Sequence, residues 1–134
     1  MAEVQTRTLN ATGIMPSLTV DNVQRSVDFF NGLGFDVEER WEENSVLMGV
    51  MLKAGNVRLG LSQEDGKKGT NRVKGVGMRL YIEARDSIDE IAARAKAAGL
   101  ALTSEPHDTE WGSRVFEVTE PSGFLLTISS PSPK

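Results

Sequence analysis

The chain contains 134 residues, of which 39% are hydrophobic and 25% are charged, a composition typical of one compact globular domain. Its 15 basic and 19 acidic residues give a formal net charge of −4, which disfavours nucleic-acid partners because phosphate binding needs clustered positive charge. The lack of cysteine excludes disulfides and thiolate chemistry, and a single histidine excludes a metal site with several histidine ligands in one chain. No apolar run reaches the ~20 residues of a membrane span, and the N-terminus lacks a signal-peptide pattern, so we expect a cytoplasmic protein.

The first half of the chain predicts a strand, a helix and then further strands. Apolar and small polar residues alternate between Ile14 and Val20, as in a half-buried strand. Asp21 and Asn22 offer side-chain oxygens that can cap a helix, and apolar residues at helical spacing follow until Gly34. The expected elements of this half are a strand at 14–20, a helix at 23–33, a strand at 37–40 and a hairpin of 45–53 with 56–62.

The second half of the chain repeats this order after a polar loop at residues 63–71. Ser87 and Glu90 have the spacing of a capping box, in which each side chain satisfies the other's free backbone amide. The helix that follows stops at Gly99. The expected elements of this half are strands at 77–83, 101–103, 114–119 and 124–129, with a helix at 88–98.

The two halves are related by a nearly constant offset. Gly34 and Gly99, which follow the two helices, are 65 residues apart, and the strand positions Met15 and Arg79 are 64 residues apart. An offset of half the chain length indicates a duplicated unit. We therefore expect a tail at 1–12 and one domain at 13–131, made of a first module at about 13–62, a linker at 63–75 and a second module at about 76–131.

Several segments, in order and correctly spaced, resemble one known group of proteins. They are Pro16–Asn22, Ser26, Phe29-Phe30, Leu33–Phe35, Arg79–Glu83, Ala98–Leu100, Trp111–Phe116 and Glu120–Phe124. This pattern is similar to that of the vicinal oxygen chelate superfamily, which includes glyoxalases, bleomycin-resistance proteins and extradiol dioxygenases. The resemblance implies an α+β fold in which two βαβββ modules form a strongly curved mixed sheet around a cup.

The resemblance also places the superfamily's four metal-ligand positions on this sequence. They fall at Met15, near Gly60, at Arg79 and at Thr127. None of the four is a histidine, aspartate, glutamate or glutamine, and a cationic Arg79 would repel a metal ion. The departure from the family pattern predicts a branch without metal or other cofactor, similar to the bleomycin-resistance proteins.

Alternation along the strands separates residues that face the helices from residues that line the cup. Leu18, Val57, Leu59 and Leu61 are among those expected to meet the helices. The opposite face, together with a loop tryptophan, supplies the expected ligand-binding residues, which are Met15, Ser17, Arg58, Arg79, Tyr81, Glu83, Trp111, Glu117 and Thr127. This mixture of apolar and hydrogen-bonding groups suits a bound organic molecule.

Individual candidates allow two interpretations. Arg79 could pair with a ligand carboxylate or form a salt bridge to Glu83 or Glu117 across the sheet, and the two interpretations are compatible. Tyr81 and Glu83 are weak candidates for an acid or base, although a tyrosine in a cup more often packs or donates a hydrogen bond.

The aromatic and loop candidates also have a structural alternative. Trp111 and Trp41 are candidates for stacking on a planar ligand, with packing at the rim as the alternative, which we favour for Trp41. His107 is expected in a solvated polar loop, and Glu38–Glu43 on a solvated strand edge.

The sequence therefore predicts reversible, metal-free binding of a small, partly aromatic or anionic organic molecule, as in antibiotic resistance by sequestration. By resemblance we expect a homodimer with no nucleic-acid or membrane partner. One alternative is a glyoxalase-like lyase, isomerase or dioxygenase that uses a metal or acid–base residues in the same cup. Another is a regulatory domain with a degenerate cup.

Overall fold

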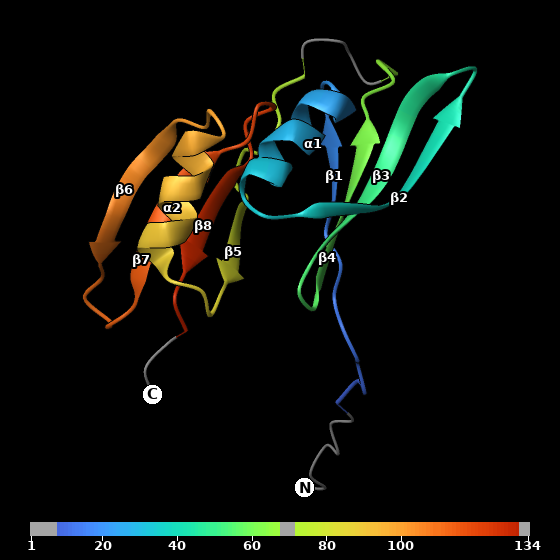
Figure 1. Ribbon diagram of the computed structural model, residues 1–134. Helices are drawn as coiled ribbons and strands as arrows, with labels where there is room; N and C mark the ends of the chain where they lie inside the picture. Colours follow the sequence, from blue (N-terminus) through green and yellow to red (C-terminus); the bar gives the residue numbers. More distant parts are fainter. Residues whose placement is uncertain (1–7, 68–71, 132–134) are drawn as a thin grey trace, which may run out of the picture.

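A computed structural model describes residues 8–67 and 72–131 of the chain. The described residues form two successive βαβββ units, shown in Figure 1. The first unit consists of β1 (Ser17–Val20), α1 (Val23–Gly32), β2 (Asp36–Glu43), β3 (Val46–Ala54) and β4 (Val57–Gln63). The second consists of β5 (Arg79–Glu83), α2 (Ile88–Ala97), β6 (Leu102–Asp108), β7 (Arg114–Thr119) and β8 (Leu125–Ser129).

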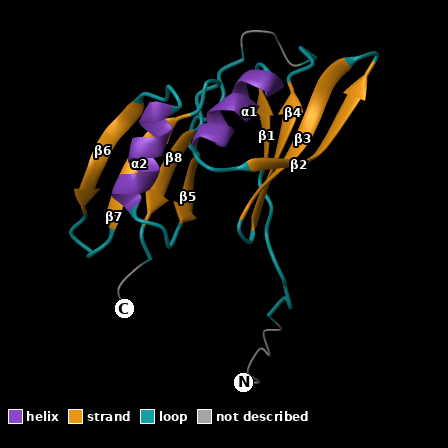
Figure 2. Cartoon of the chain, in the orientation of Figure 1, coloured by secondary structure: helices purple, strands orange, loops and turns teal. Residues whose placement is uncertain are grey.

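Each unit contributes a four-stranded mixed sheet, which confirms the α+β fold and the two modules expected from the sequence. The strand order is β1-β4-β3-β2 in the first sheet and β5-β8-β7-β6 in the second. In both sheets the strand before the helix pairs in parallel with the last strand of the unit, and the other pairs are antiparallel. The sheets stand side by side, and both helices lie on the same side of them (Figure 2).

Helix boundaries follow the capping signals in the sequence. The side chain of Asn22 accepts a 3.0 Å hydrogen bond from the backbone N–H of Arg25. The Ser87 hydroxyl likewise accepts a 3.3 Å hydrogen bond from the backbone N–H of Glu90. Gly34 and Gly99 follow the helices with φ of 102° and 95°, a region that L-residues with a Cβ rarely adopt. These equivalent glycines confirm the internal duplication.

The core lies between each sheet and its helix and is continuous from one module to the other. Leu18, Leu59 and Leu61 are buried there, as the alternation predicts. Val57 lies on the same face of β4 but is 43% exposed, so the prediction that it meets the helices is wrong. It lines a gap between the modules instead of packing beneath α1.

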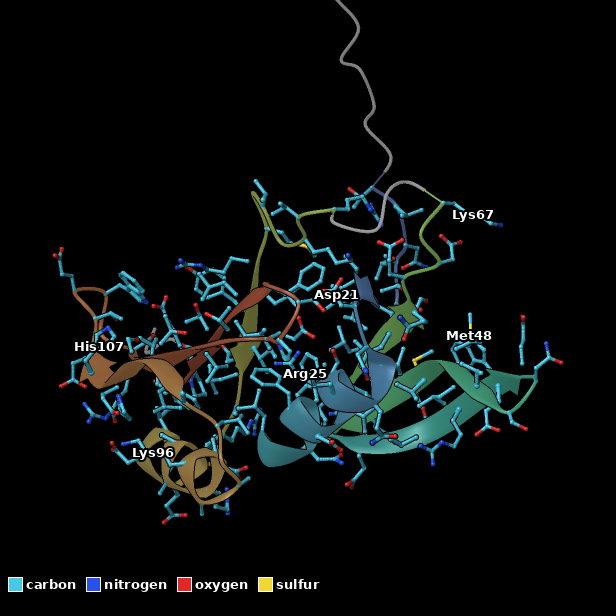
Figure 3. The ribbon with its side chains drawn as sticks, turned by 90° about the horizontal axis from the view of Figure 1, so that it is seen from above. Asp21, Arg25, Met48, Lys67, Lys96 and His107 are labelled. Atoms are coloured by element: carbon cyan, nitrogen blue, oxygen red, sulfur yellow. The ribbon has the colours of Figure 1, made fainter. Side chains whose placement is uncertain are left out.

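The outermost strand of the second sheet is longer than predicted. β6 continues through Pro106 and His107 to Asp108, with two register shifts against β7. Proline, which has no N–H to donate, is tolerated here because β6 is an edge strand and Pro106 lies within one of the register shifts. The expected loop position of His107 is therefore wrong, and the residue lies on the outer strand of the second sheet (Figure 3).

The segment before β5 is anchored to the first module by a buried cation, Lys74. The Lys74 ammonium contacts Asp21 at 2.6 Å and Glu64 at 3.1 Å. Arg72 reaches the same Glu64 carboxylate at 2.7 Å. These contacts, together with a 2.8 Å hydrogen bond from the Asp21 N–H to the Ser122 hydroxyl, hold the two modules in one arrangement.

Candidate ligand-binding site

The surface of the second sheet that faces away from α2 carries most of the predicted site residues, and we call it the open face. Leu80 and Ile82 alternate with them and face the core. Pairing between the strands places Tyr81 beside Thr127, and Thr127 beside Glu117. The open face comprises Arg79, Tyr81, Glu83, Glu117, Leu125, Thr127 and Ser129.

Arg79 is held by a carboxylate of its own sheet. Its Nη1 lies 3.2 Å from Oε2 of Glu117, two strands away. The same Oε2 accepts a 3.4 Å hydrogen bond from Thr127, and Oε1 accepts one of the same length from Ser104. Of the two interpretations of Arg79, the structure therefore contains the salt bridge, and its partner is Glu117 rather than Glu83.

The Arg79 guanidinium also lies over the ring of Tyr81, with 5.9 Å between its central carbon and the ring centroid. This is the distance range of a cation–π contact. Because Glu117 holds the guanidinium on one side, the contact restricts the orientation of Tyr81. The rest of the tyrosine stays accessible, since the residue is 63% exposed.

A cavity of about 390 Å³ brings together Tyr81, Glu83 and Trp111 from the predicted set. Its other lining residues are Ser113, Ser129 and Ser130. These serines are not among the ligand contacts predicted from the sequence. One of them could have been found by strand pairing, because Ser129 lies beside Glu83 on the neighbouring strand β8. The cavity has aromatic walls, one carboxylate and several hydroxyl groups.

Trp111 is presented by a short turn between β6 and β7. The hydroxyl of Thr109 accepts a 3.1 Å hydrogen bond from the N–H of Ser113 and donates one of 3.0 Å to the carbonyl oxygen of the same residue. The backbone N–H of Thr109 also donates to that oxygen, at 2.8 Å. The closed turn leaves Trp111 64% exposed at its tip, at the edge of the cavity.

The predicted residues of the first module lie on the other sheet or just before it. Met15 precedes β1, and Ser17 begins this strand. The Nε of Arg58 bonds to Glu38 at 2.7 Å, and this contact holds the pKa of that carboxyl below its usual range. The register of β2 shifts beside Glu38, which makes that partner hard to predict. The structure therefore does not bring Met15, Ser17 or Arg58 into the cavity of Tyr81 and Trp111.

Trp41 packs within its own sheet. Its indole covers Gly49 on β3, where an added Cβ would lie 2.5 Å from the ring. Trp41 pairs with Gly49 in the strand register, so the glycine makes room for the ring. This geometry supports the packing interpretation of Trp41 rather than ligand stacking.

A second cavity, of about 590 Å³, lies in the seam between the modules. It is lined on one side by Leu33, Phe35 and Val57 and on the other by Ile82 and Ile91. Glu83 lines both this seam cavity and the cavity on the open face. The seam cavity is larger, but it contains no exposed aromatic side chain, since Phe35 is buried.

The four positions expected for metal ligands do not offer suitable donors. Met15 is a weak ligand for hard cations, Gly60 has no side chain, and Arg79 is cationic and paired with Glu117. The hydroxyl of Thr127 donates to Glu117. Within residues 8–67 and 72–131, no three His, Cys, Asp or Glu side chains are grouped closely enough to hold a metal ion. The chemistry of these residues therefore does not fit a divalent cation.

Comparison with known proteins places this fold in one family. A family model described as the Glyoxalase/Bleomycin resistance protein/Dioxygenase superfamily matches residues 9–128. A comparison with curated proteins found no match.

Across the described residues, the helices are too short or too polar to cross a membrane.

Solved structures share the architecture at low sequence identity. TioX from Micromonospora sp. ML1 is 20% identical, with a TM-score of 0.73 over 90% of this chain and 98% of that chain. A bleomycin-binding protein complexed with bleomycin is 19% identical, with a TM-score of 0.67 over 90% and 99%. A glyoxalase-related enzyme from Fulvimarina pelagi is 15% identical, with a TM-score of 0.70 over 92% and 89%. These similarities show a common fold.

Proposed function

Because the chain belongs to the glyoxalase/bleomycin resistance protein/dioxygenase superfamily, we propose that it binds a small organic molecule with a planar ring on its second module. The site is the cavity formed by Tyr81, Glu83, Trp111 and three serines. The observation that carries the proposal is the convergence of two mostly exposed aromatic side chains on this cavity. Large aromatic side chains left accessible on a surface often mark a binding site.

The local geometry supports binding without a metal. The Thr109–Ser113 turn fixes the backbone that carries Trp111, and the guanidinium of Arg79 lies over the ring of Tyr81, so the site is partly ordered before a ligand arrives. Such preorganisation lowers the entropic cost of binding. The Ser130 hydroxyl accepts from the Arg114 N–H and keeps its own proton for a ligand, and the Ser129 hydroxyl donates to the Ser130 carbonyl and can still accept from a ligand.

We also propose that the protein is a homodimer in the cytoplasm and that ligand sequestration can confer antibiotic resistance. Ile14 and Val76 are almost fully exposed apolar side chains, and burial in a dimer would remove them from water. The mass in solution, measured by light scattering, tests the dimer. Growth of cells expressing the protein in the presence of an antibiotic that it binds tests the resistance.

A thermal-shift screen tests the binding function. The screen offers planar aromatic compounds, aromatic acids and bleomycin, and affinities of the hits are then measured for Trp111→Ala and Tyr81→Ala. Each variant is expected to weaken binding about fivefold or more, because a stacking contact on the ligand is lost. Trp41→Ala, which removes the tryptophan on the other sheet, is the matched control and is expected to leave the affinity unchanged.

Two results would refute the assignment of this site. One is a set of hits whose affinities do not change in Trp111→Ala or Tyr81→Ala. The other is an equal loss of affinity in Trp41→Ala, which would indicate a general effect on the fold.

A further inference from the structure

Resting on the proposed function, we propose that the ligand of the open-face cavity is a planar organic cation, such as an aromatic amidinium or a protonated heteroaromatic amine. Glu83 is the one formally charged side chain that lines this cavity. No ion pair to Glu83 forms within the described parts of the chain. The Glu83 carboxylate is exposed and is therefore accessible to a ligand cation.

The nearby arginine does not make the cavity a receptor for anions. Arg79 is already paired with Glu117, and Thr127 and Ser104 donate to the same carboxylate. An incoming anion would have to compete with this arrangement for the guanidinium. The charges of Arg79 and Glu117 cancel, so Glu83 leaves the open face with an excess of one negative charge beside the aromatic rings.

The aromatic walls favour the same class of ligand. The faces of tyrosine and tryptophan rings carry partial negative charge and attract cations as well as stacking on planar groups. Arg79 already makes such a contact with Tyr81, which shows that this ring can accept a guanidinium. An amidinium carried on an aromatic ring would contact Glu83 with its charge and Trp111 with its ring.

Three probes of nearly equal shape test the charge of the ligand. Benzamidine is a planar cation at pH 7.5, benzamide is its neutral counterpart and benzoate is its anionic one. Dissociation constants are measured for the full chain by chemical-shift titration. We expect benzamidine to bind about fivefold more tightly than benzamide, and benzoate to bind most weakly.

Two variants assign the preference to named charges. Glu83→Gln is expected to reduce the affinity for benzamidine to that for benzamide. The affinity for benzamide itself is expected to stay unchanged. Arg79→Gln removes the guanidinium over the Tyr81 ring and frees the Glu117 carboxylate, so it is expected to retain the preference for benzamidine over benzamide and to gain no affinity for benzoate. Glu42→Gln, which removes an exposed carboxylate of β2 on the other sheet, is the matched control and is expected to retain the native preference.

The outcomes separate this inference from the proposed function. If benzamide or benzoate binds as tightly as benzamidine and Trp111→Ala weakens all three, the site binds planar molecules and the inferred cation preference is wrong. A benzoate affinity that exceeds the others and disappears in Arg79→Gln would identify an anion site and also overturn the inference. If no probe shifts the resonances of Tyr81 or Trp111, both proposals fail.

Discussion

Ser26 on α1 donates a hydrogen bond to Glu120 in the turn between β7 and β8, so a buried hydroxyl of one module binds a buried carboxylate of the other. The second carboxylate oxygen accepts a 2.7 Å hydrogen bond from the backbone N–H of Ser122. Both side chains are almost fully inaccessible to water. A buried carboxylate is costly unless its oxygens are hydrogen-bonded, so this contact helps to fix the relative position of the modules.

Ser26→Ala is expected to destabilise the protein by about 1–3 kcal/mol, because one oxygen of Glu120 loses its donor while it stays buried. Urea unfolding of the variant measures the loss. Ser17→Ala, at an exposed position of β1, is the control and is expected to change the free energy of unfolding by less than about 0.5 kcal/mol. Equal stability of the two variants would contradict the role given to the Ser26–Glu120 bond.

The Glu64 carboxylate makes stability depend on pH in the acid range. Hydrogen bonds from Arg72, from the N–H of Gly66 and from Lys74 lower the pKa of Glu64 from 4.5 to about 2. The unfolded chain therefore takes up this proton at a higher pH than the folded chain. The stabilisation is present above pH 4.5 and is lost as the pH falls toward about 2.

Glu64→Gln is accordingly expected to reduce the slope of stability against pH. Between about pH 5 and about pH 3, the native chain loses more free energy of unfolding than the variant does. Urea unfolding at several pH values measures both slopes. Parallel pH profiles of the native chain and the variant would contradict the prediction, because they would mean that Glu64 has the same pKa in the folded and the unfolded chain.

Gly123→Ala is expected to destabilise the fold by about 2 kcal/mol or more. Gly123 has a φ of 115°, and a Cβ there would lie 2.8 Å from the carbonyl oxygen of Lys74, a backbone atom that cannot move aside. Thermal unfolding compares this variant with Gly13→Ala, whose added methyl group meets no neighbour within 4 Å. The prediction is wrong if both variants melt at the temperature of the native chain.

Protein purified without an affinity tag is expected to bind no stoichiometric Zn²⁺, Ni²⁺, Mn²⁺ or Fe²⁺. The donors at Met15, Gly60, Arg79 and Thr127 do not suit these ions. The protein is exposed to each metal, separated from free metal by gel filtration, and its metal content per chain is measured by elemental analysis. One metal per chain would contradict this expectation and would favour the alternative of a metal-dependent lyase or dioxygenase.

Local signals in the sequence predicted most of the fold. These signals act within a few residues, so they can be identified from a single sequence. They are the capping residues such as Asn22 and Ser87, the glycines after the helices, and the alternation of inward- and outward-facing residues in β4 and β8. Features that depend on distant partners were missed. The Ser26–Glu120 bond joins positions 94 residues apart, and Val57 is exposed because of the gap between modules.

The candidate site was predicted only in part for the same reason. Alternation placed Tyr81 and Glu83 on one face, and the cavity brings them together with Trp111. Alternation alone could not choose between the two interpretations of Arg79, because Glu117 lies two strands away from it. It also grouped Arg58 with these residues, although Arg58 belongs to the other sheet and pairs with Glu38.

The residues that a bound ligand contacts decide whether the open-face cavity is the binding site. Chemical shifts of the labelled protein, recorded with the strongest hit of the thermal-shift screen, report which residues the ligand contacts. We expect the largest changes at Tyr81, the Trp111 indole, Ser113 and Ser129, around the cavity on the open face. Changes centred instead on Leu33, Val57 and Ile91 would place the ligand in the seam between the modules and would contradict the proposed site.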